Sequence, residues 1–245
     1  MKTTSLFATI MIAFSHAAFA NECAVHSDSQ VRALVELYTS EGCSSCPPAD
    51  RWLSELATRG DKRVVPIAFH VSYWDYIGWK DRFASPLYTE RQRDMAQAQG
   101  SSMVYTPQVM IGGRDYRRWS STGAVEKTVE EIARTPAPAA IAITMKPVAD
   151  SGIEGRATLT GGGKSTLFVA LTQDGLSSKV TAGENRGENL HHNAVVRDFA
   201  AISGDGSFRF ARKADWDPAH MSLVAFAQDP RTGRVLQALS APLCR

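Results

Sequence analysis

Two cysteines separated by two residues, Cys43 and Cys46, have the clearest chemical capacity in this chain. They follow an apolar, β-branched segment, residues 31–38, which predicts a buried strand. Pro47-Pro48 comes next and predicts the first turn of a helix running to about Arg59, because first-turn N–H groups have no intrahelical partner. Free N–H groups at a helix N-terminus stabilise a thiolate. The spacing therefore favours thiol–disulfide exchange, with Cys43 as nucleophile and Cys46 as resolving thiol.

Two other interpretations compete with exchange chemistry. A C-x-x-C pair supplies half of a structural zinc site, but no second cysteine pair or H-x-x-x-H partner stands near it in the sequence. A short structural disulfide is the other alternative. We prefer redox chemistry because the pair lies between a strand and a helix, and we expect no metal and no cofactor.

The N-terminus predicts the cellular compartment. Met1-Lys2 is basic, residues 6–14 are apolar, and Ala18-Phe19-Ala20 has the small residues of a signal-peptidase site. We expect residues 1–20 to be a signal peptide cleaved after Ala20, and the mature protein to be periplasmic or secreted. The apolar run is too short to cross a bilayer, so we expect no membrane insertion.

The charge balance is nearly neutral. The formal net charge is +2, and it falls by one when Lys2 is removed with the signal peptide. This balance gives no support for binding to nucleic acid or another polyanion. We expect instead protein or small-molecule partners that carry a disulfide or a thiol, and the sequence does not set the oligomeric state.

The other two cysteines, Cys23 and Cys244, lie near opposite ends of the mature chain. An oxidising compartment favours pairing, and domain termini often lie close together in space. We therefore predict disulfides Cys43–Cys46 and Cys23–Cys244. Two independent thiols, or a link between chains, are the alternatives for the second pair.

The segments after the first helix extend this pattern. Residues 63–71 predict a second strand, parallel to the first because a helix joins them. Residues 72–85 form an aromatic loop, and residues 86–99 a polar helix that Gly100 ends. Two short strands around Gly112-Gly113 and a last helix complete the order β-α-β-α-β-β-α, the last three elements being 109–111, 115–119 and 124–134.

In this order the chain resembles the thioredoxin-like superfamily over roughly residues 28–135, with Thr106-Pro107 standing just before the third strand. The segments ELYTSEGCSSCPPAD, HVSYWDYIGWKDRFAS, YTERQ and YTPQVMIGG more closely resemble a family of secreted bacterial proteins known as domain of unknown function 1223. Members of that family have a thioredoxin-like domain followed by a β-rich domain. The resemblance implies a fold more than a physiological role.

The resemblance implies roles for several residues. Pro107 corresponds to a cis-proline that faces the C-x-x-C, and Thr106 to the backbone that pairs with an extended substrate. An ordinary trans proline at a strand entry is the alternative. We expect Cys43 to be the more exposed cysteine at the helix start, with Cys46 within the first turn. The buried acid of many thioredoxins, six residues before the first cysteine, is replaced here by Leu37.

His70 is the best candidate for moving protons in place of that acid. It ends the second strand, at the sheet edge where the C-x-x-C emerges, although a structural histidine fits equally.

Glu36 should face away from the site. Trp74, in the loop 73–79, is either a wall of a substrate groove or part of a small core. Arg91 and Arg93 are interpreted as solvated or salt-bridged.

The second half of the sequence has a different pattern of apolar and turn residues. Thr135 and the Pro/Ala linker 136–140 predict a boundary between a domain of residues 21–135 and one of residues 141–245. Alternating apolar segments predict an all-β, sandwich-like domain, with strands at 141–148, 155–160, 165–172, 193–202, 206–212, 221–228 and 235–241. His191-His192 with Glu184 and Asp205 match no metal-site template, so we expect a loop or interdomain role.

The leading functional hypothesis is a periplasmic or secreted thiol–disulfide oxidoreductase acting through Cys43 and Cys46. The alternatives are a Cu(I)-binding or copper-delivery protein, since paired thiolates suit Cu(I), and a non-catalytic binding module on a thioredoxin-like scaffold. No Met-rich tract or third ligand accompanies the cysteine pair, which weakens the copper hypothesis.

Overall fold

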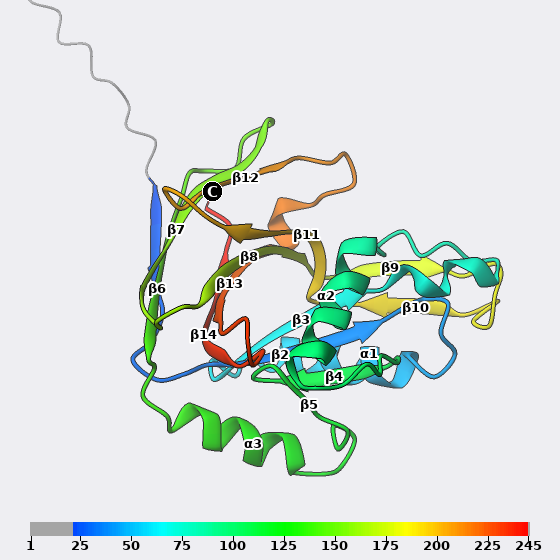
Figure 1. Ribbon diagram of the computed structural model, residues 1–245. Coiled ribbons are helices and arrows are strands. Elements are labelled where there is room, and N and C mark those ends of the chain that lie inside the picture. The colour runs from blue at the N-terminus through cyan, green and yellow to red at the C-terminus, as the bar shows by residue number, and fades with distance from the viewer. Residues whose placement is uncertain (1–21, 245) are drawn as a thin grey trace, which may run out of the picture.

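The computed structural model describes residues 22–244, and the predicted signal peptide lies outside this range. An eight-stranded sheet joins both halves of the chain (Figure 1). Its strands, in spatial order, are β14 (Val235–Pro242), β13 (Met221–Gln228), β8 (Thr166–Gln173), β11 (Val195–Ile202), β3 (Val64–His70), β2 (Ala33–Thr39), β4 (Gln108–Ile111) and β5 (Arg114–Asp115).

The strands β2 and β3 run parallel, as predicted, and their register sets Thr39 opposite His70. β4 pairs antiparallel with β2. The turn that carries the C-x-x-C leaves the carboxyl end of β2 and enters helix α1 (Pro47–Thr58). Because parallel strands end at the same sheet edge, this turn and His70 are neighbours.

The two faces of β2 follow the strand alternation of period two. Ala33, Val35 and Leu37 face α1 and helix α3 (Ala124–Ala133) in one apolar core. Leu34 and Tyr38 face helix α2 (Pro86–Ala98), which covers the opposite side of the sheet. The β-α-β part of the fold is therefore covered by helices on both faces.

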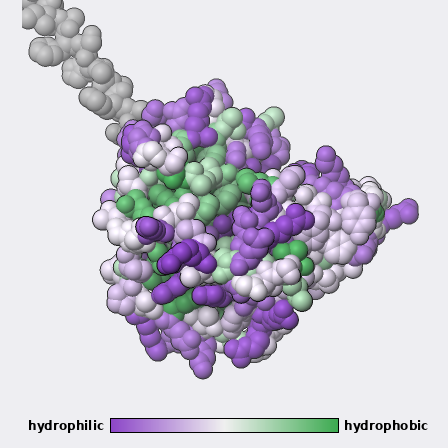
Figure 2. Space-filling model, in the orientation of Figure 1, coloured by the Kyte–Doolittle hydropathy of each residue, from purple (hydrophilic) through white to green (hydrophobic). Residues whose placement is uncertain are grey.

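The α2 face of the sheet also carries a hydrophobic depression. Figure 2 shows hydrophobic side chains gathered over β8 and β11 on the face turned to the viewer. A pocket of about 470 Å³ lies there, between these strands and α2, with Phe168 and Phe199 in its lining. Neither cysteine of the C-x-x-C lines this pocket.

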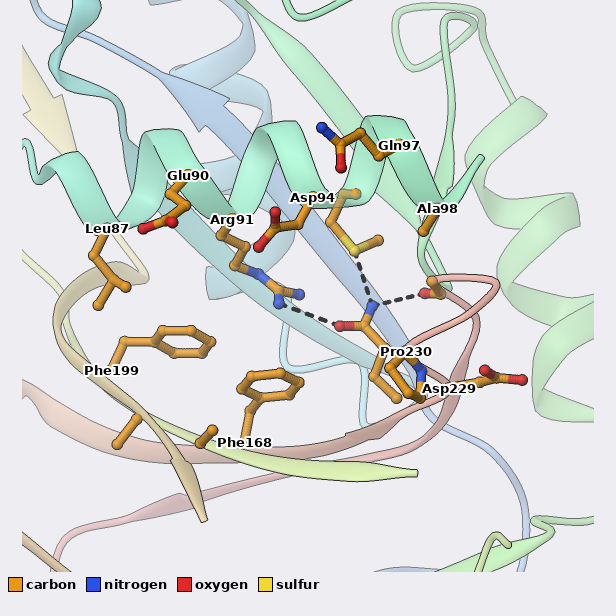
Figure 3. A pocket seen from close by; sticks show the side chains of 15 residues that line it. Leu87, Glu90, Arg91, Asp94, Gln97, Ala98, Phe168, Phe199, Asp229 and Pro230 are labelled. Atoms are coloured by element: carbon orange, nitrogen blue, oxygen red, sulfur yellow. Dashed lines mark hydrogen bonds between the residues drawn. The ribbon is translucent and has the colours of Figure 1, made fainter. Parts of the chain in front are cut away.

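A buried ion pair fastens α2 to the sheet beside this pocket. Arg91 reaches down from α2 toward Phe168 and Phe199 (Figure 3), and its Nε lies 3.1 Å from Oε1 of Glu36 on β2. The guanidinium also donates to Gln228 at 3.2 Å. Its central carbon lies about 5 Å from four phenylalanine rings, which suits cation–π attraction. Glu36 faces away from the C-x-x-C, as predicted.

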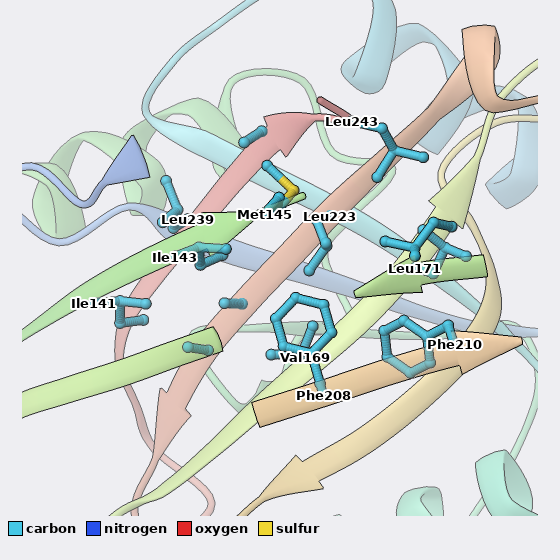
Figure 4. Close-up of a cluster of buried hydrophobic side chains, with 14 of the residues drawn as sticks. Ile141, Ile143, Met145, Val169, Leu171, Phe208, Phe210, Leu223, Leu239 and Leu243 are labelled. Carbon is cyan, nitrogen blue, oxygen red and sulfur yellow. The ribbon is translucent and has the colours of Figure 1, made fainter. Parts of the chain in front are cut away.

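The far half of the large sheet packs against a second sheet instead of helices. This four-stranded sheet has the order β1 (Cys23–His26), β6 (Ala139–Met145), β7 (Gly152–Gly161) and β12 (Ser207–Ala211). Figure 4 shows side chains such as Ile143, Val169, Leu223 and Phe208 filling the space between the layers. The packing in this half is that of a sandwich.

A disulfide joins Cys23 on β1 to Cys244 after β14, as predicted, with the two Cα atoms 5.7 Å apart. β1 pairs with β6 along its whole length. The bridge therefore ties the beginning of the described chain into the C-terminal half.

The predicted division into two domains at residues 136–140 differs from this arrangement. β3 of the first half pairs with β11 of the second through Val195 and Ala68, so one sheet crosses the predicted boundary. β6 begins at Ala139, within the predicted linker, and β1 belongs to the C-terminal layer. The physical reason is that β3 would be an unpaired edge strand of the sheet if β11 did not pair with it.

Within residues 22–244, no helix has the length and apolar character needed to cross a membrane.

Candidate functional site

Cys43 and Cys46 form a disulfide, as predicted, in the turn between β2 and α1. Cys46 is the N-cap of α1, and its carbonyl accepts from the N–H groups of Ala49 and Asp50 at 2.9 and 3.1 Å. The helix therefore starts one residue after Cys46. The prediction that Cys46 lies within the first turn is wrong, because Pro47 occupies the first helical position and fixes the start there.

The loop before β4 lies beside the disulfide. The Thr106-Pro107 peptide bond is cis, as the resemblance implied. The Ser45 hydroxyl points at the Thr106 carbonyl at 3.5 Å, and Trp74 Nε1 donates to Thr106 Oγ1 at 2.8 Å. Thr106, Pro107 and Trp74, three predicted substrate-binding residues, therefore lie together next to the C-x-x-C.

Trp74 belongs to a short 3₁₀ helix, Ser72–Ile77, inside the predicted aromatic loop. Trp74 packs against the core of the α2 face, while Tyr76 is exposed. This helix and the turn approach closely at Gly42, where a Cβ would stand 3.1 Å from Trp74 Cβ. Trp74 thus packs partly against the core and links this loop to Thr106.

A hairpin from the C-terminal half covers the disulfide. Its strands are β9 (Leu176–Lys179) and β10 (Asn189–His192). From the loop between them, Asn185 Nδ2 donates to the carbonyls of Glu41 and Cys43 at 2.8 and 3.0 Å. Glu184 Oε2 accepts from the Ser44 N–H at 3.0 Å.

Both cysteines are 0% exposed as a result. The prediction that Cys43 is the more exposed cysteine is therefore wrong for the disulfide form. The covering residues stand at least 140 positions away in the sequence, where local patterns give no sign of the contact. Ser44 and Ser45 are exposed beside the disulfide.

His70, the fourth predicted site residue, is buried and paired with a carboxylate. Its Nδ1 lies 2.6 Å from Asp81 Oδ2, and that oxygen also accepts from the Glu41 N–H at 2.9 Å. Burial alone would lower the pKa of His70, but the Asp81 carboxylate outweighs it and raises that pKa. Asp81 thus joins the end of β3 to the residue two positions before Cys43.

A second histidine–carboxylate pair faces the first. His192 Nε2 lies 3.3 Å from Glu41 Oε1, and the His70 and His192 rings meet edge to face with centroids 5.0 Å apart. Burial would raise the pKa of Glu41, but the contact with His192 and the hydrogen bond from Trp79 are among the interactions that hold it below its usual value. His192 was not a predicted site residue, because its contact with Glu41 joins residues more than 140 positions apart in the sequence.

Asp50, in the first turn of α1, is the third buried carboxyl group of this cluster. Its Oδ2 has no hydrogen-bond partner among residues 22–244. Burial raises the pKa of Asp50, against the opposing influence of the His192 and His70 imidazoles. A buried carboxyl oxygen without a hydrogen-bond partner is costly, so its presence beside a disulfide points to a function.

The residues weighed for a metal site do not meet. His191 is exposed while its neighbour His192 is buried, as strand alternation predicts. Glu184 contacts Ser44, whereas Asp205 pairs with Arg156 at the far end of the fold. Between residues 22 and 244, no cluster of three or more His, Cys, Asp or Glu side chains is arranged to hold a metal ion.

The His70–Asp81 pair predicts a pH dependence of stability. Because the pKa of His70 is raised by folding, its contribution is complete below its unfolded value, about 6.5, and disappears as pH rises through the folded value. The pKa of Asp81 is lowered, so its contribution is present above about pH 3.9 and disappears as pH falls through the folded value. The pair should therefore stabilise the fold most between about pH 4 and 6.5.

The variant His70→Gln tests this dependence. Near pH 6 it should lower the free energy of unfolding by roughly 3–5 kcal/mol, because Asp81 is left buried without its partner. The deficit, measured by urea denaturation, should shrink as pH rises above about 6.5. The exposed His26→Gln is the control. A deficit that stays constant from pH 5 to 9 would show that the pair is not ionised.

Two features define the class of this protein: a parallel β-α-β unit with a C-x-x-C disulfide before the helix, and a cis-proline loop beside it. It is a mostly β-sheet protein that contains this parallel β-α-β unit and the Cys43–Cys46 disulfide. The chain belongs to the family described as Protein of unknown function (DUF1223), which matches residues 34–228.

Solved structures share the fold. Protein AGR_C_4864 from Agrobacterium tumefaciens, known from an X-ray crystal structure, is 25% identical with a TM-score of 0.65; the match covers 89% of this chain and 97% of that one. HBP35 of Porphyromonas gingivalis is 15% identical with a TM-score of 0.62, over 89% of this chain and 76% of that one. No curated protein sequence matches.

Proposed function

We propose that this protein is a thiol–disulfide oxidoreductase on a thioredoxin-like scaffold, acting in the periplasm or outside the cell on protein or small-molecule disulfides and thiols. One observation carries the proposal. The Cys43–Cys46 disulfide lies at the N-terminus of helix α1 and beside the loop that contains the cis-proline Pro107. Helix N-terminal N–H groups lower thiol pKa values, which favours exchange.

The reductive direction shows the chemistry required. The thiolate of Cys43 attacks one sulfur of a substrate disulfide, and the other substrate sulfur leaves as a thiolate that takes up a proton. The Cys46 thiolate then attacks Cys43, which releases the second substrate thiol and forms Cys43–Cys46. Two electrons pass to the substrate, and an external dithiol restores the reduced pair. The oxidative direction is the reverse of these steps.

The surroundings of the disulfide suggest where a substrate enters. Ser44 and Ser45 are exposed, and Ser45 borders the Thr106 carbonyl. An extended substrate can pair with the backbone of Thr106 from this side. The Asn185 and Glu184 contacts must open to expose the sulfur atoms, because both cysteines are covered.

Exchange stoichiometry tests the proposal. The reduced protein, with Cys23–Cys244 intact, should consume one equivalent of glutathione disulfide per chain and lose two titratable thiols, both in the Cys43–Cys46 peptide by mass spectrometry. The variant Cys43→Ser should lose this reaction, and Cys23→Ser/Cys244→Ser should retain it. Inertness toward glutathione disulfide together with tight, stoichiometric Cu(I) binding would overturn the proposal in favour of copper binding.

A further inference from the structure

The candidate site contains a buried acid, Asp50, that comes from helix α1 and not from strand β2. Leu37 of β2 packs in the apolar core against α1 and supplies no titratable group. Asp50 of α1 is buried in the same layer, with a relative exposure of 6%. No step of the exchange chemistry described above uses Asp50.

Helix geometry directs Asp50 toward the cysteine pair. The Asp50 N–H donates to the Cys46 carbonyl at 3.1 Å, which closes the first i to i+4 turn of α1. Residues four apart lie on the same helix face, and Cα–Cβ bonds tilt toward the N-terminus. The Asp50 side chain therefore leans along the buried face toward Cys46, which is 0% exposed.

The other charged groups around Asp50 come from three elements. His70 is on β3, His192 is on β10, and Asp81 follows the 3₁₀ helix. The two imidazoles favour a charged Asp50, while burial and the Asp81 carboxylate favour a protonated one. These opposing influences suit a carboxyl group that takes up and releases a proton.

We infer that Asp50 is the group that accepts the proton of Cys46 when this thiol resolves a mixed disulfide on Cys43. The inference rests on the proposed function. The Cys46 S–H proton passes to the Asp50 carboxylate, and the resulting thiolate attacks the Cys43 sulfur. The Cys43–substrate bond breaks, and its electron pair leaves with the substrate sulfur, which is protonated by solvent. In the reverse direction, Asp50 returns its proton to the departing Cys46 thiolate.

The test follows the lifetime of the mixed disulfide. Reduced protein is mixed with glutathione disulfide, acid-quenched at intervals and analysed by mass spectrometry. In Asp50→Asn the Cys43–glutathione adduct should accumulate, and its resolution at pH 7 should be slower by about 10²-fold. The deficit should shrink above about pH 8.5, where a thiol loses its proton without a base. Asp50→Glu should restore part of the rate, and Glu55→Gln, exposed on the same helix, should change nothing.

Two readouts separate this inference from a structural role and from the proposed function. The oxidised Asp50→Asn protein should be at least as stable as wild type in urea at pH 7, because a buried charge with a raised pKa is removed. Resolution at the wild-type rate, or a deficit that does not vary with pH, would overturn the role of Asp50. If glutathione disulfide does not oxidise the Cys43–Cys46 pair of wild type at all, the proposed function fails first.

Discussion

The variant Cys46→Ala should capture substrates as stable mixed disulfides through Cys43. Without the resolving thiol, the adduct formed by the first attack has no intramolecular escape, because the substrate leaves only when Cys46 attacks Cys43. We expect nearly complete conversion to a disulfide-linked adduct with a model peptide disulfide. Turnover with an external dithiol as reductant should fall by about 10³-fold, because the variant has lost the thiol that resolves the adduct on Cys43. Non-reducing electrophoresis and peptide mass spectrometry measure both results.

The matched control is Cys43→Ala, which leaves Cys46 alone and buried at the helix N-cap. It should form little or no adduct. Capture by Cys43→Ala and not by Cys46→Ala would exchange the roles of the two cysteines. Capture by neither variant would favour a structural disulfide.

The variant Glu36→Gln should cause the largest loss of stability outside the redox site. It leaves the Arg91 guanidinium buried among phenylalanine rings without a counter-charge, since both side chains are almost fully buried. Breaking such a pair costs roughly 3–5 kcal/mol in the free energy of unfolding. Urea denaturation at pH 7 measures the loss, and α2 should lose hydrogen-exchange protection first.

Removing both charges should restore most of the stability. Glu36→Leu/Arg91→Met places apolar side chains in an apolar setting, and such replacements are often neutral or stabilising. The exposed pair Glu130–Arg134 at the C-terminal end of α3 provides the comparison, because Glu130→Gln should change stability by less than about 1 kcal/mol. A loss of that small size for Glu36→Gln would mean that water reaches the Arg91 site.

The elements that carry strong local patterns were predictable. Proline pairs, glycine stops and apolar alternation predicted α1, α2 and β13 to within a residue. The hairpin β9–β10 was not predicted, because its short strands are polar, with Leu-Ser-Ser-Lys and Asn-Leu-His-His as their sequences. The second strand of the short hairpin was predicted at 115–119 but spans Arg114–Asp115, since Gly112-Gly113 forms a tight turn.

The candidate site was predictable only in part. The C-x-x-C, Thr106-Pro107 and the place of His70 follow from sequence order and strand direction. The carboxylates Glu41, Asp50 and Asp81 gave no such signal, because an acid in a turn or at a helix start is ordinary. The contacts of these carboxylates with His70 and His192 join separate elements of the fold, and the one between Glu41 and His192 joins residues far apart in the sequence. The contact of Asn185 with the turn that carries the disulfide is equally long-range. The four-residue spacing of Cys46 and Asp50 is the one local sign that was available.

The reduction potential of the Cys43–Cys46 pair distinguishes a redox-active disulfide from a structural one. Wild-type protein is equilibrated in buffers of defined thiol–disulfide ratio, and free thiols are trapped and located by mass spectrometry. We expect one two-electron transition at Cys43–Cys46 within the range of redox-active pairs, about −120 to −270 mV, while Cys23–Cys244 stays oxidised. A potential below about −300 mV, as for structural disulfides, would mean that Cys43–Cys46 is a structural bridge and not an exchange site.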